Sequence, residues 1–298
     1  MPVIFPRISK KSSPKRSPAI SSINKSEKSL FPYLFSLFFI VAFLDSWWRA
    51  DVHPLVMFET EGRENLWKFF TGMFPPELSW NFLSLLFRPF LETIQISMMG
   101  TLIAVGIGFP FGLLGTRTFM VGGVLNEADV KGSPSRFALR WSGYFMARGV
   151  LSLFCSIPEF VWAFMFVRAV GLGPFPGVLA IGVAYGGMLG KVYSEIFEGV
   201  NYRPLEALQS TGANKMQVFF YGWLPQVLPN FVSYTLYRWE CAVRASAILG
   251  LVGAGGLGQQ IEISMRMFNF HEVLTLLIIL FLMVAAVDYI SAKVRAIL

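Results

Sequence analysis

Long apolar runs separated by short polar segments constrain this chain more than any other feature of its sequence. Of its 298 residues, 54% are hydrophobic and 14% are charged, whereas an average soluble domain has about 25% charged residues. A soluble domain of this length could not bury so much apolar surface, so the bilayer must act as solvent. The runs are continuous rather than alternating, which predicts an all-α polytopic membrane protein instead of a barrel. Six runs are long enough to cross a membrane, at residues 30–48, 90–114, 146–167, 174–193, 226–249 and 271–291.

The N-terminal segment differs in composition from the rest of the chain. Residues 1–29 are rich in Lys, Arg, Ser and Pro and have no apolar face, which predicts a disordered basic cytosolic arm. A secretory signal is the alternative, but an Asp-Ser-Trp-Trp-Arg belt follows the apolar run in place of a small-residue cleavage site. We therefore expect three parts: this arm, a first transmembrane helix with an outside loop over 30–89, and a transmembrane domain over 90–298.

The distribution of Lys and Arg predicts the orientation in the membrane. With the N-terminus in the cytosol, 16 of the 25 basic residues fall in cytosolic segments, 6 fall outside and 3 lie within spans. This asymmetry places both termini in the cytosol. The formal net charge of +7 is then mainly an orientation signal and gives no reason to expect a nucleic-acid partner. Cys155 and Cys241 both lie in apolar runs, so no disulfide framework is expected.

Motifs for nucleotide hydrolysis and for covalent catalysis are absent from the sequence. The Gly-Lys pair at Gly190 has Tyr185 where a Walker A loop requires glycine. A G-x-G-x-x-G match begins at Gly253, but it follows a membrane helix instead of a β-strand. His53 and His271 are far apart in the chain and suggest no metal site. We therefore expect no enzyme activity, no cofactor bound by this chain, and an energy source outside it.

The polar segment between the fourth and fifth predicted spans is the most informative one. Pro204 suits the first turn of a short helix, Glu206 lies near the positive end of that helix, and Gly212 predicts where it stops. A second, amphipathic helix is expected over 213–221, with Leu224-Pro225 ending it. A pair of helices that merely lies on the lipid surface would have the same shape, so shape alone assigns no function.

The same segment contains a recognisable pattern of residues. Glu206-Ala207-Leu208, Gly212, Gly222 and Leu224-Pro225 resemble the E-A-A-x3-G-x9-I-x-L-P loop of inner-membrane permeases of binding-protein-dependent ABC importers. Leu208 and Gly222 depart from that pattern. The resemblance implies the type I transmembrane-domain fold of these importers. It also implies that residues 201–225 are a cytosolic coupling loop, in which Glu206, Ala207, Gly212, Leu224 and Pro225 shape the contact with a groove on an ATPase subunit.

Further motifs narrow the resemblance to phosphonate-type permeases. They are Ile157–Ala163, Val170–Phe175, Ser210–Lys215 and Ala247–Gly258. The resemblance implies a permease that moves phosphonate anions across a bacterial inner membrane. It would work as a homodimer, with two ATPase subunits that hold ATP and Mg and with a periplasmic binding protein. Cys155 stands where the resemblance leads us to expect an arginine, so the substrate preference here can differ.

Glu159, Arg238, Glu240 and Arg244 are charged residues inside predicted spans. A charge there costs about 2.5–3.5 kcal/mol on insertion scales and usually faces a cavity or a partner helix. Glu240 and Arg244 are four residues apart on one helix face and can pair, whereas Arg238 lies on another face. One interpretation is a structural ion pair. The other is an anion path, because the planar fork of arginine suits a phosphonate.

The Gly-rich segment 250–258 is predicted to lie at the outer face, leading into the last span. Gly253, Gly255, Gly256 and Gly258 permit close backbone packing and left-handed turns. The segment is either an outer gate beside a docked binding protein or a tight packing loop. The family resemblance favours the gate.

Alternatives to phosphonate import remain open from sequence alone. The same architecture could carry phosphite, hypophosphite or another small oxyanion, because the binding protein mainly sets specificity in such importers. A secondary transporter or channel that needs no ATPase would predict an inverted repeat and broken helices with paired carboxylates, and the sequence shows no such duplication. A membrane-embedded enzyme would need paired metal ligands or a nucleophile motif, and the sequence shows neither.

Overall fold

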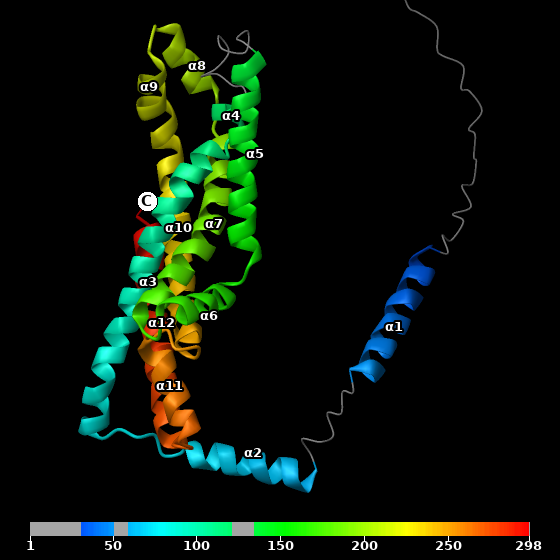
Figure 1. Ribbon diagram of the computed structural model, residues 1–298, viewed down its shortest axis with the longest axis vertical. Coiled ribbons are helices and arrows are strands. Elements are labelled where there is room, and N and C mark those ends of the chain that lie inside the picture. Colours follow the sequence, from blue (N-terminus) through cyan, green and yellow to red (C-terminus); the bar gives the residue numbers. More distant parts are fainter. Residues whose placement is uncertain (1–30, 51–58, 121–133, 298) are drawn as a thin grey trace, which may run out of the picture. The chain divides into compact units, whose positions relative to one another are not determined.

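The computed structural model describes residues 31–50, 59–120 and 134–297, and these ranges contain only helices and their connections. The predicted arm, residues 1–29, lies outside the described residues. The chain divides into two compact units, residues 1–63 and 64–298. In the first unit, α1 (Phe31–Arg49) is an apolar helix with all its residues exposed. The other helices (Figure 1) are α2 (Thr60–Met73), α3 (Trp80–Leu114), α4 (Arg117–Met120), α5 (Pro134–Ser156), α6 (Glu159–Val170), α7 (Pro174–Glu198), α8 (Arg203–Ser210), α9 (Lys215–Gln217), the π-helix η2 (Val218–Trp223), α10 (Leu224–Gly250), α11 (Gly256–Arg266) and α12 (Phe270–Arg295).

Four of these helices, α1, α3, α7 and α12, are long and apolar enough to cross a membrane. The bent pair α5–α6 makes a fifth if it is counted as one span. α10 has 27 residues and is therefore long enough to cross a membrane. Because it carries Arg238, Glu240 and Arg244, it does not qualify as a span by apolar composition alone. With α10 included, the helices follow the six predicted spans in order. The prediction of an all-α membrane protein is confirmed.

The third predicted span, 146–167, is wrong as a continuous helix. α5 ends at Ser156, α6 begins at Glu159, and the two axes are bent by 88°. Pro158 explains the break, because its ring disfavours the α conformation at the residue before it and it has no amide hydrogen to continue the helix. Glu159 is consequently not in the middle of a span. It lies in the first turn of α6, where the positive end of the helix favours a carboxylate.

The predicted outside loop also contains helical structure that was not expected. α2 lies within it, and Phe69 of α2 packs edge-on against Phe270 at the start of α12, with ring centroids 5.1 Å apart. α3 begins at Trp80, well before the predicted start at residue 90. Polar residues interrupt both segments, so a search for uninterrupted apolar runs does not detect them.

Glycines let α3 and α7 pack with their backbones in contact. Gly100, Gly108 and Gly112 on α3 face Gly182, Gly186 and Gly190 on α7. A Cβ built on Gly108 would lie 3.0 Å from the backbone nitrogen of Gly190, and one on Gly190 would lie 3.1 Å from the Gly108 carbonyl oxygen. This four-residue spacing of small residues is typical of close helix packing in membranes, where lipid supplies no hydrophobic drive for association.

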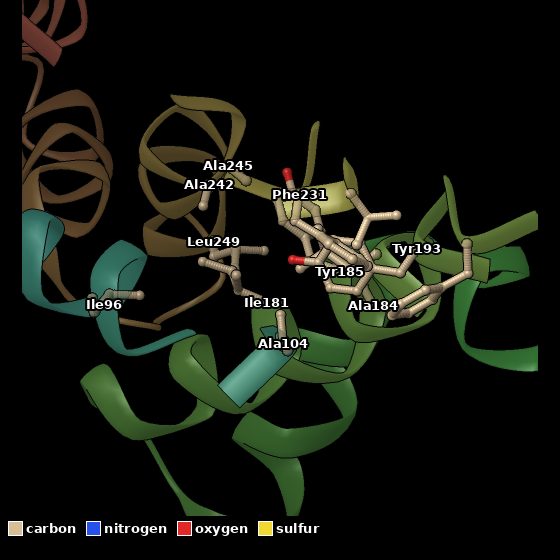
Figure 2. Close-up of a cluster of buried hydrophobic side chains, with 14 of the residues drawn as sticks. Ile96, Ala104, Ile181, Ala184, Tyr185, Tyr193, Phe231, Ala242, Ala245 and Leu249 are labelled. Atoms are coloured by element: carbon tan, nitrogen blue, oxygen red, sulfur yellow. The ribbon is translucent and has the colours of Figure 1, made fainter. Parts of the chain in front are cut away.

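The main core forms where α3, α7 and α10 meet. Figure 2 shows Ile96 and Ala104 of α3, with Ile181 and Tyr185 of α7, facing buried side chains of α10 such as Leu249. A second buried cluster joins α3 and α10 to α11 and α12, and includes Leu86, Val243, Leu257 and Leu276. Because α10 contributes to both clusters, a displacement of α10 must disturb both.

Candidate functional site

The short helix expected after Pro204 is present as α8. Pro204 lies in its first turn, as does Glu206. The helix ends at Ser210 with Thr211 as its cap, and Gly212 takes a φ of +86°, a left-handed conformation that strains residues with a Cβ. The Ala213 N–H then donates to the Leu208 carbonyl at 3.3 Å, which closes the end of the helix. The predicted helix and its glycine stop are confirmed.

The second half of the loop differs from the helix expected over 213–221. Asn214 and Gln217 form a capping box, in which each side-chain oxygen accepts a hydrogen bond from the other residue's backbone N–H at 2.9 Å. α9 follows for one turn, continues as η2, and runs into α10 without interruption. Leu224-Pro225 therefore begins α10, and the prediction that it ends a helix is wrong. Proline is tolerated in the first turn of a helix, where its fixed φ is already helical.

Trp223 attaches this loop to the helix bundle. Its side chain is fully buried, and its Nε1 donates to the Phe197 carbonyl near the end of α7 at 3.2 Å. The indole ring lies 4.5 Å from the Phe119 ring of α4 and 6.1 Å from the Tyr202 ring, centroid to centroid. The loop is thus fixed to the ends of α4 and α7 instead of lying free.

The opposite side of the loop is exposed. α8 turns Glu206 and Ala207 outward, and Met216 and Tyr221 are 65% and 77% exposed. An open hollow of about 410 Å³ lies between α8 and η2 and is lined by Leu208, Thr211, Gly212, Ala213, Gln217 and Tyr221. The exposed surface is therefore both polar and apolar and partly concave, which suits contact with another protein.

The predicted pairing of Glu240 with Arg244 is wrong. Glu240 is 5% exposed, and its Oε1 accepts a hydrogen bond from Arg295 Nη2 at 2.6 Å. Arg244 instead pairs with Asp288, with its Nη2 3.5 Å from Oδ1. Arg295 and Asp288 both belong to α12, which packs along α10. The two charges of α10 therefore pair with a neighbouring helix and not with each other. The two ion pairs fasten α10 to α12.

Arg238 has a different environment from these paired charges. Its Nε and Nη2 donate to the Tyr234 hydroxyl at 2.9 and 2.8 Å. Its guanidinium carbon lies between 5.3 and 5.9 Å from the ring centroids of Tyr185, Tyr234 and Tyr237. Among the described residues, no carboxylate lies within 4 Å of it, and Glu159 makes no ion pair with it. Arg238 is thus a half-buried cation held by a neutral oxygen and by aromatic faces.

The four candidate gate glycines at the start of α11 are buried and tightly packed. Gly253, Gly255 and Gly256 have φ values between +72° and +91°. A Cβ on Gly258 would lie 1.8 Å from the Ala247 carbonyl oxygen. A side chain at Gly258 would therefore have to move the backbone of α10, whereas one at Gly253, Gly255 or Gly256 would meet Leu172, Pro174 or Thr93.

α3 holds the start of α11 in place. The Gly256 N–H donates to a Glu92 carboxylate oxygen at 3.3 Å, and the Leu257 N–H donates to Thr93 Oγ1 at 2.9 Å. These bonds satisfy two of the amide groups that the first turn of a helix leaves without partners. The Gly-rich segment is therefore fixed to α3 as well as to α10.

Residues 132–296 match the family of binding-protein-dependent transport system inner membrane components, which covers more than half of the chain. The chain belongs to this family. It is the membrane-spanning permease subunit of an ABC importer and not an enzyme, and the alternative of a secondary transporter or channel is wrong. Within residues 31–50, 59–120 and 134–297, no group of His, Cys, Asp or Glu side chains is placed to hold a metal ion.

Two relatives illustrate how similar the permease is to named transport proteins. It is 38% identical over 208 residues to the phosphite transport system permease protein PtxC of Stutzerimonas stutzeri, covering 70% of this chain and 69% of that protein. It is 32% identical over 253 residues to the phosphate-import permease protein PhnE of Mycolicibacterium smegmatis, covering 82% of this chain and 42% of that protein.

The fold of the permease also has a solved counterpart. It resembles the MetNI methionine ABC transporter in an inward-facing conformation, with a TM-score of 0.60 and 23% identity. The match covers 74% of this chain and 98% of that chain. The predicted type I transmembrane-domain fold is confirmed.

One charged cluster of the permease was not predicted from the sequence. Glu198, at the end of α7, accepts hydrogen bonds from the Arg117 N–H at 2.7 Å and from Arg148 Nη2 at 3.4 Å. Arg148 Nε also donates to the Gly115 carbonyl at 3.0 Å. The cluster joins α4, α5 and α7 near the start of the 201–225 loop. The sequence did contain a signal for this cluster. Arg148 lies inside a predicted span, and a charged residue there needs a partner.

Proposed function

We propose that this permease imports small phosphorus oxyanions, with phosphonates as the first candidate, across a bacterial inner membrane. It works as a homodimer with two ATPase subunits that bind ATP and Mg, and with a periplasmic binding protein that delivers the anion. Both termini lie in the cytosol, and residues 49–89 and 250–270 lie outside. Two ATPase subunits would need two coupling loops, and one copy of this chain supplies one. This supports a homodimer.

The observation that supports the cargo class is the half-buried cation Arg238 in a chain similar to a phosphite and a phosphate permease. Arginine binds phosphorus oxyanions well because its planar fork can contact two oxygens at once. Phosphite or hypophosphite is the second candidate, and the name of the Stutzerimonas relative favours phosphite. Cys155, near the bend between α5 and α6, can contribute to that choice.

Of the four candidate residues in the anion path, Arg238 is the one we propose to meet the cargo. Arg244 is already paired with Asp288, and Glu240 with Arg295. Glu159 is itself an anion and would repel the cargo. We propose that Glu240 and Arg244 position α10, whereas Arg238 supplies the positive charge.

We propose that the loop transmits movement from the ATPase. Glu206 and Ala207 lie on the exposed face of α8, and Gly212 makes the turn behind them. Leu224 and Pro225 lie where the loop becomes α10, so a displacement of the loop reaches α10 directly. For the outer face, we propose that Gly253, Gly255, Gly256 and Gly258 form a rigid seal that moves with α3 and α10.

The test of this function is ATP-driven uptake by the complete complex in proteoliposomes. The permease, its ATPase and its binding protein are reconstituted with ATP enclosed, and uptake of methylphosphonate is measured against phosphite, hypophosphite, phosphate and methionine. We expect methylphosphonate uptake that requires ATP, with phosphite as the strongest competitor. Uptake of methionine but of no phosphorus oxyanion would contradict the cargo class, and uptake without ATP would contradict the mechanism.

A further inference from the structure

Gly222 lies in η2 with the leucines of α8 directly against its backbone. A Cβ built on Gly222 would lie 2.6 Å from Leu205 Cδ2 and 2.8 Å from Leu208 Cδ1. Both distances are shorter than any ordinary carbon–carbon contact, so the two leucines already occupy the space that a side chain at 222 would need. Leu205 is fully buried, and Leu208 is half-buried over it.

Leu208 and Gly222 are also the two positions at which this loop departs from the pattern it resembles. Where the pattern has Ala on the first helix and Ile on the second, this chain has a large residue on α8 and no side chain on η2. The structure brings these two positions into contact across the loop. The larger side chain at 208 therefore fills space that the missing side chain at 222 leaves free. A packed interior tolerates such volume-conserving changes best.

We propose that Leu208 and Gly222 are a compensated packing pair that makes α8, η2 and α10 a single rigid lever. This inference rests on the proposed coupling function. α8 carries the exposed face offered to the ATPase, and η2 continues without a break into the helix that bears Arg238. Gly212 is a turn and supplies no side-chain contact of its own, so the packing of α8 on η2 must fix the angle between them. Leu208 and Gly222 are positioning residues, because their contact with each other sets the angle of α8 on η2.

The test is a double-mutant cycle with two separate readouts. Gly222→Ile, Leu208→Ala and the double variant are compared with the unchanged protein. The first readout is the thermal unfolding of the purified permease, and the second is cargo transported per ATP hydrolysed by the reconstituted complex. We expect Gly222→Ile to lower the transport ratio by about tenfold, the effect of an overpacked contact. Leu208→Ala should lower it less, and the double variant should recover most of the loss.

Matched controls separate packing from other effects of the substitutions. Gly143→Ile introduces the same side chain into a helix where a Cβ meets nothing within 4 Å, so it should leave the unfolding temperature unchanged. Gly222→Ala should have a smaller effect than Gly222→Ile, because the ends of two leucines can move aside for one methyl group.

The outcomes distinguish this inference from the proposed function. If the double variant is no better than Gly222→Ile in both readouts, the compensated pair is refuted. If recovery is seen in unfolding but not in transport per ATP, the rigid lever is refuted although the packing is real. If the unchanged complex moves no phosphorus oxyanion, the cargo proposal fails, while the unfolding cycle still tests the packing pair.

Discussion

At the scale of single residues, neighbours on α10 have opposite surroundings. Glu240 is enclosed and bonded to Arg295, whereas Arg238, two residues earlier, is bonded to the Tyr234 hydroxyl and lies over tyrosine rings. Two residues on a helix are about 200° apart around its axis, so adjacent charges can serve different purposes. Glu240 stabilises the contact of α10 with α12, and Arg238 keeps a positive charge that pairs with no carboxylate in the part of the chain that the structure describes.

Replacing Arg238 tests the assignment of the anion contact. Arg238→Gln should reduce uptake by about tenfold to a hundredfold, the worth of one or two hydrogen bonds to a charged group. Arg238→Lys should retain part of the activity, because it keeps the charge but loses the planar fork. Uptake by the reconstituted complex is the measurement, with size-exclusion chromatography confirming assembly. Wild-type uptake by Arg238→Gln at low phosphonate concentration would exclude this residue from the path.

Removing one member of the Glu240–Arg295 pair should cost more stability than removing both. Glu240→Gln leaves Arg295 unpaired, and the cost should stay below the roughly 3–5 kcal/mol of a fully buried pair because Arg295 is 28% exposed. Glu240→Gln/Arg295→Gln should unfold at a higher temperature than Glu240→Gln alone. The comparison uses thermal unfolding in detergent. Equal unfolding temperatures for Glu240→Gln and the unchanged protein would show that the pair contributes nothing.

At the scale of secondary-structure elements, glycine acts in two ways that different substitutions can separate. In the 201–225 loop, Gly212 supplies a backbone conformation with a positive φ. Between α3 and α7, Gly108 and Gly190 supply close approach, with ordinary helical dihedral angles. Gly212 can therefore be replaced by residues that adopt the left-handed conformation. Gly108 and Gly190 cannot be replaced by any residue that has a side chain.

Gly212→Val should uncouple ATP hydrolysis from transport while the permease remains inserted. A β-branched residue at φ +86° is strained by about 1–2 kcal/mol, so the turn between α8 and α9 should change. Gly212→Asn should be nearly neutral, because Asn enters this region readily. ATPase activity and uptake are measured together on the same complex. Normal stimulated hydrolysis with normal uptake in Gly212→Val would contradict the coupling role.

Gly108→Val should separate α3 from α7 and destabilise the permease. The new side chain would meet the backbone of α7, which cannot move aside as a flexible side chain does, so we expect about 1–3 kcal/mol of destabilisation. Gly106→Val is the matched control on the same helix, because a Cβ there meets nothing within 4 Å. Yield and unfolding temperature in detergent are compared. Equal behaviour of the two variants would show that the glycine contact is not needed.

The apolar runs predicted most of the membrane helices correctly because a span must be apolar along its whole length. The sequence contains Pro158, which could have indicated the break between α5 and α6. The residues on both sides are apolar, so a search for apolar runs joined them into one span. The partners of Glu240 and Arg244 could not be predicted, because they lie 55 and 44 residues away along the chain and depend on how α12 packs against α10. The π-helical turn and the contact of Gly222 with Leu208 likewise depend on tertiary packing.

At the scale of the whole molecule, the orientation in the membrane decides which surfaces meet which partner. If the coupling loop is cytosolic, Met216→Cys in the loop should be protected from a membrane-impermeant thiol reagent added to intact cells. Leu78→Cys, between α2 and α3, should be labelled. Both residues are exposed, and Cys155 and Cys241 are replaced first. Labelling of Met216→Cys with protection of Leu78→Cys would reverse the orientation.

The pairing of Glu240 with the last residue of α12 has a consequence for how much of α10 is fastened to α12. α12 ends at Arg295, level with Glu240, and in Figure 1 the chain end lies well short of α8 and α9. The part of α10 before Glu240 therefore extends past the end of α12 by 16 residues, about 24 Å at 1.5 Å per residue. The start of α10, and with it the loop that we propose to meet the ATPase, therefore lies about 24 Å from the ion pair that fastens α10 to the end of α12.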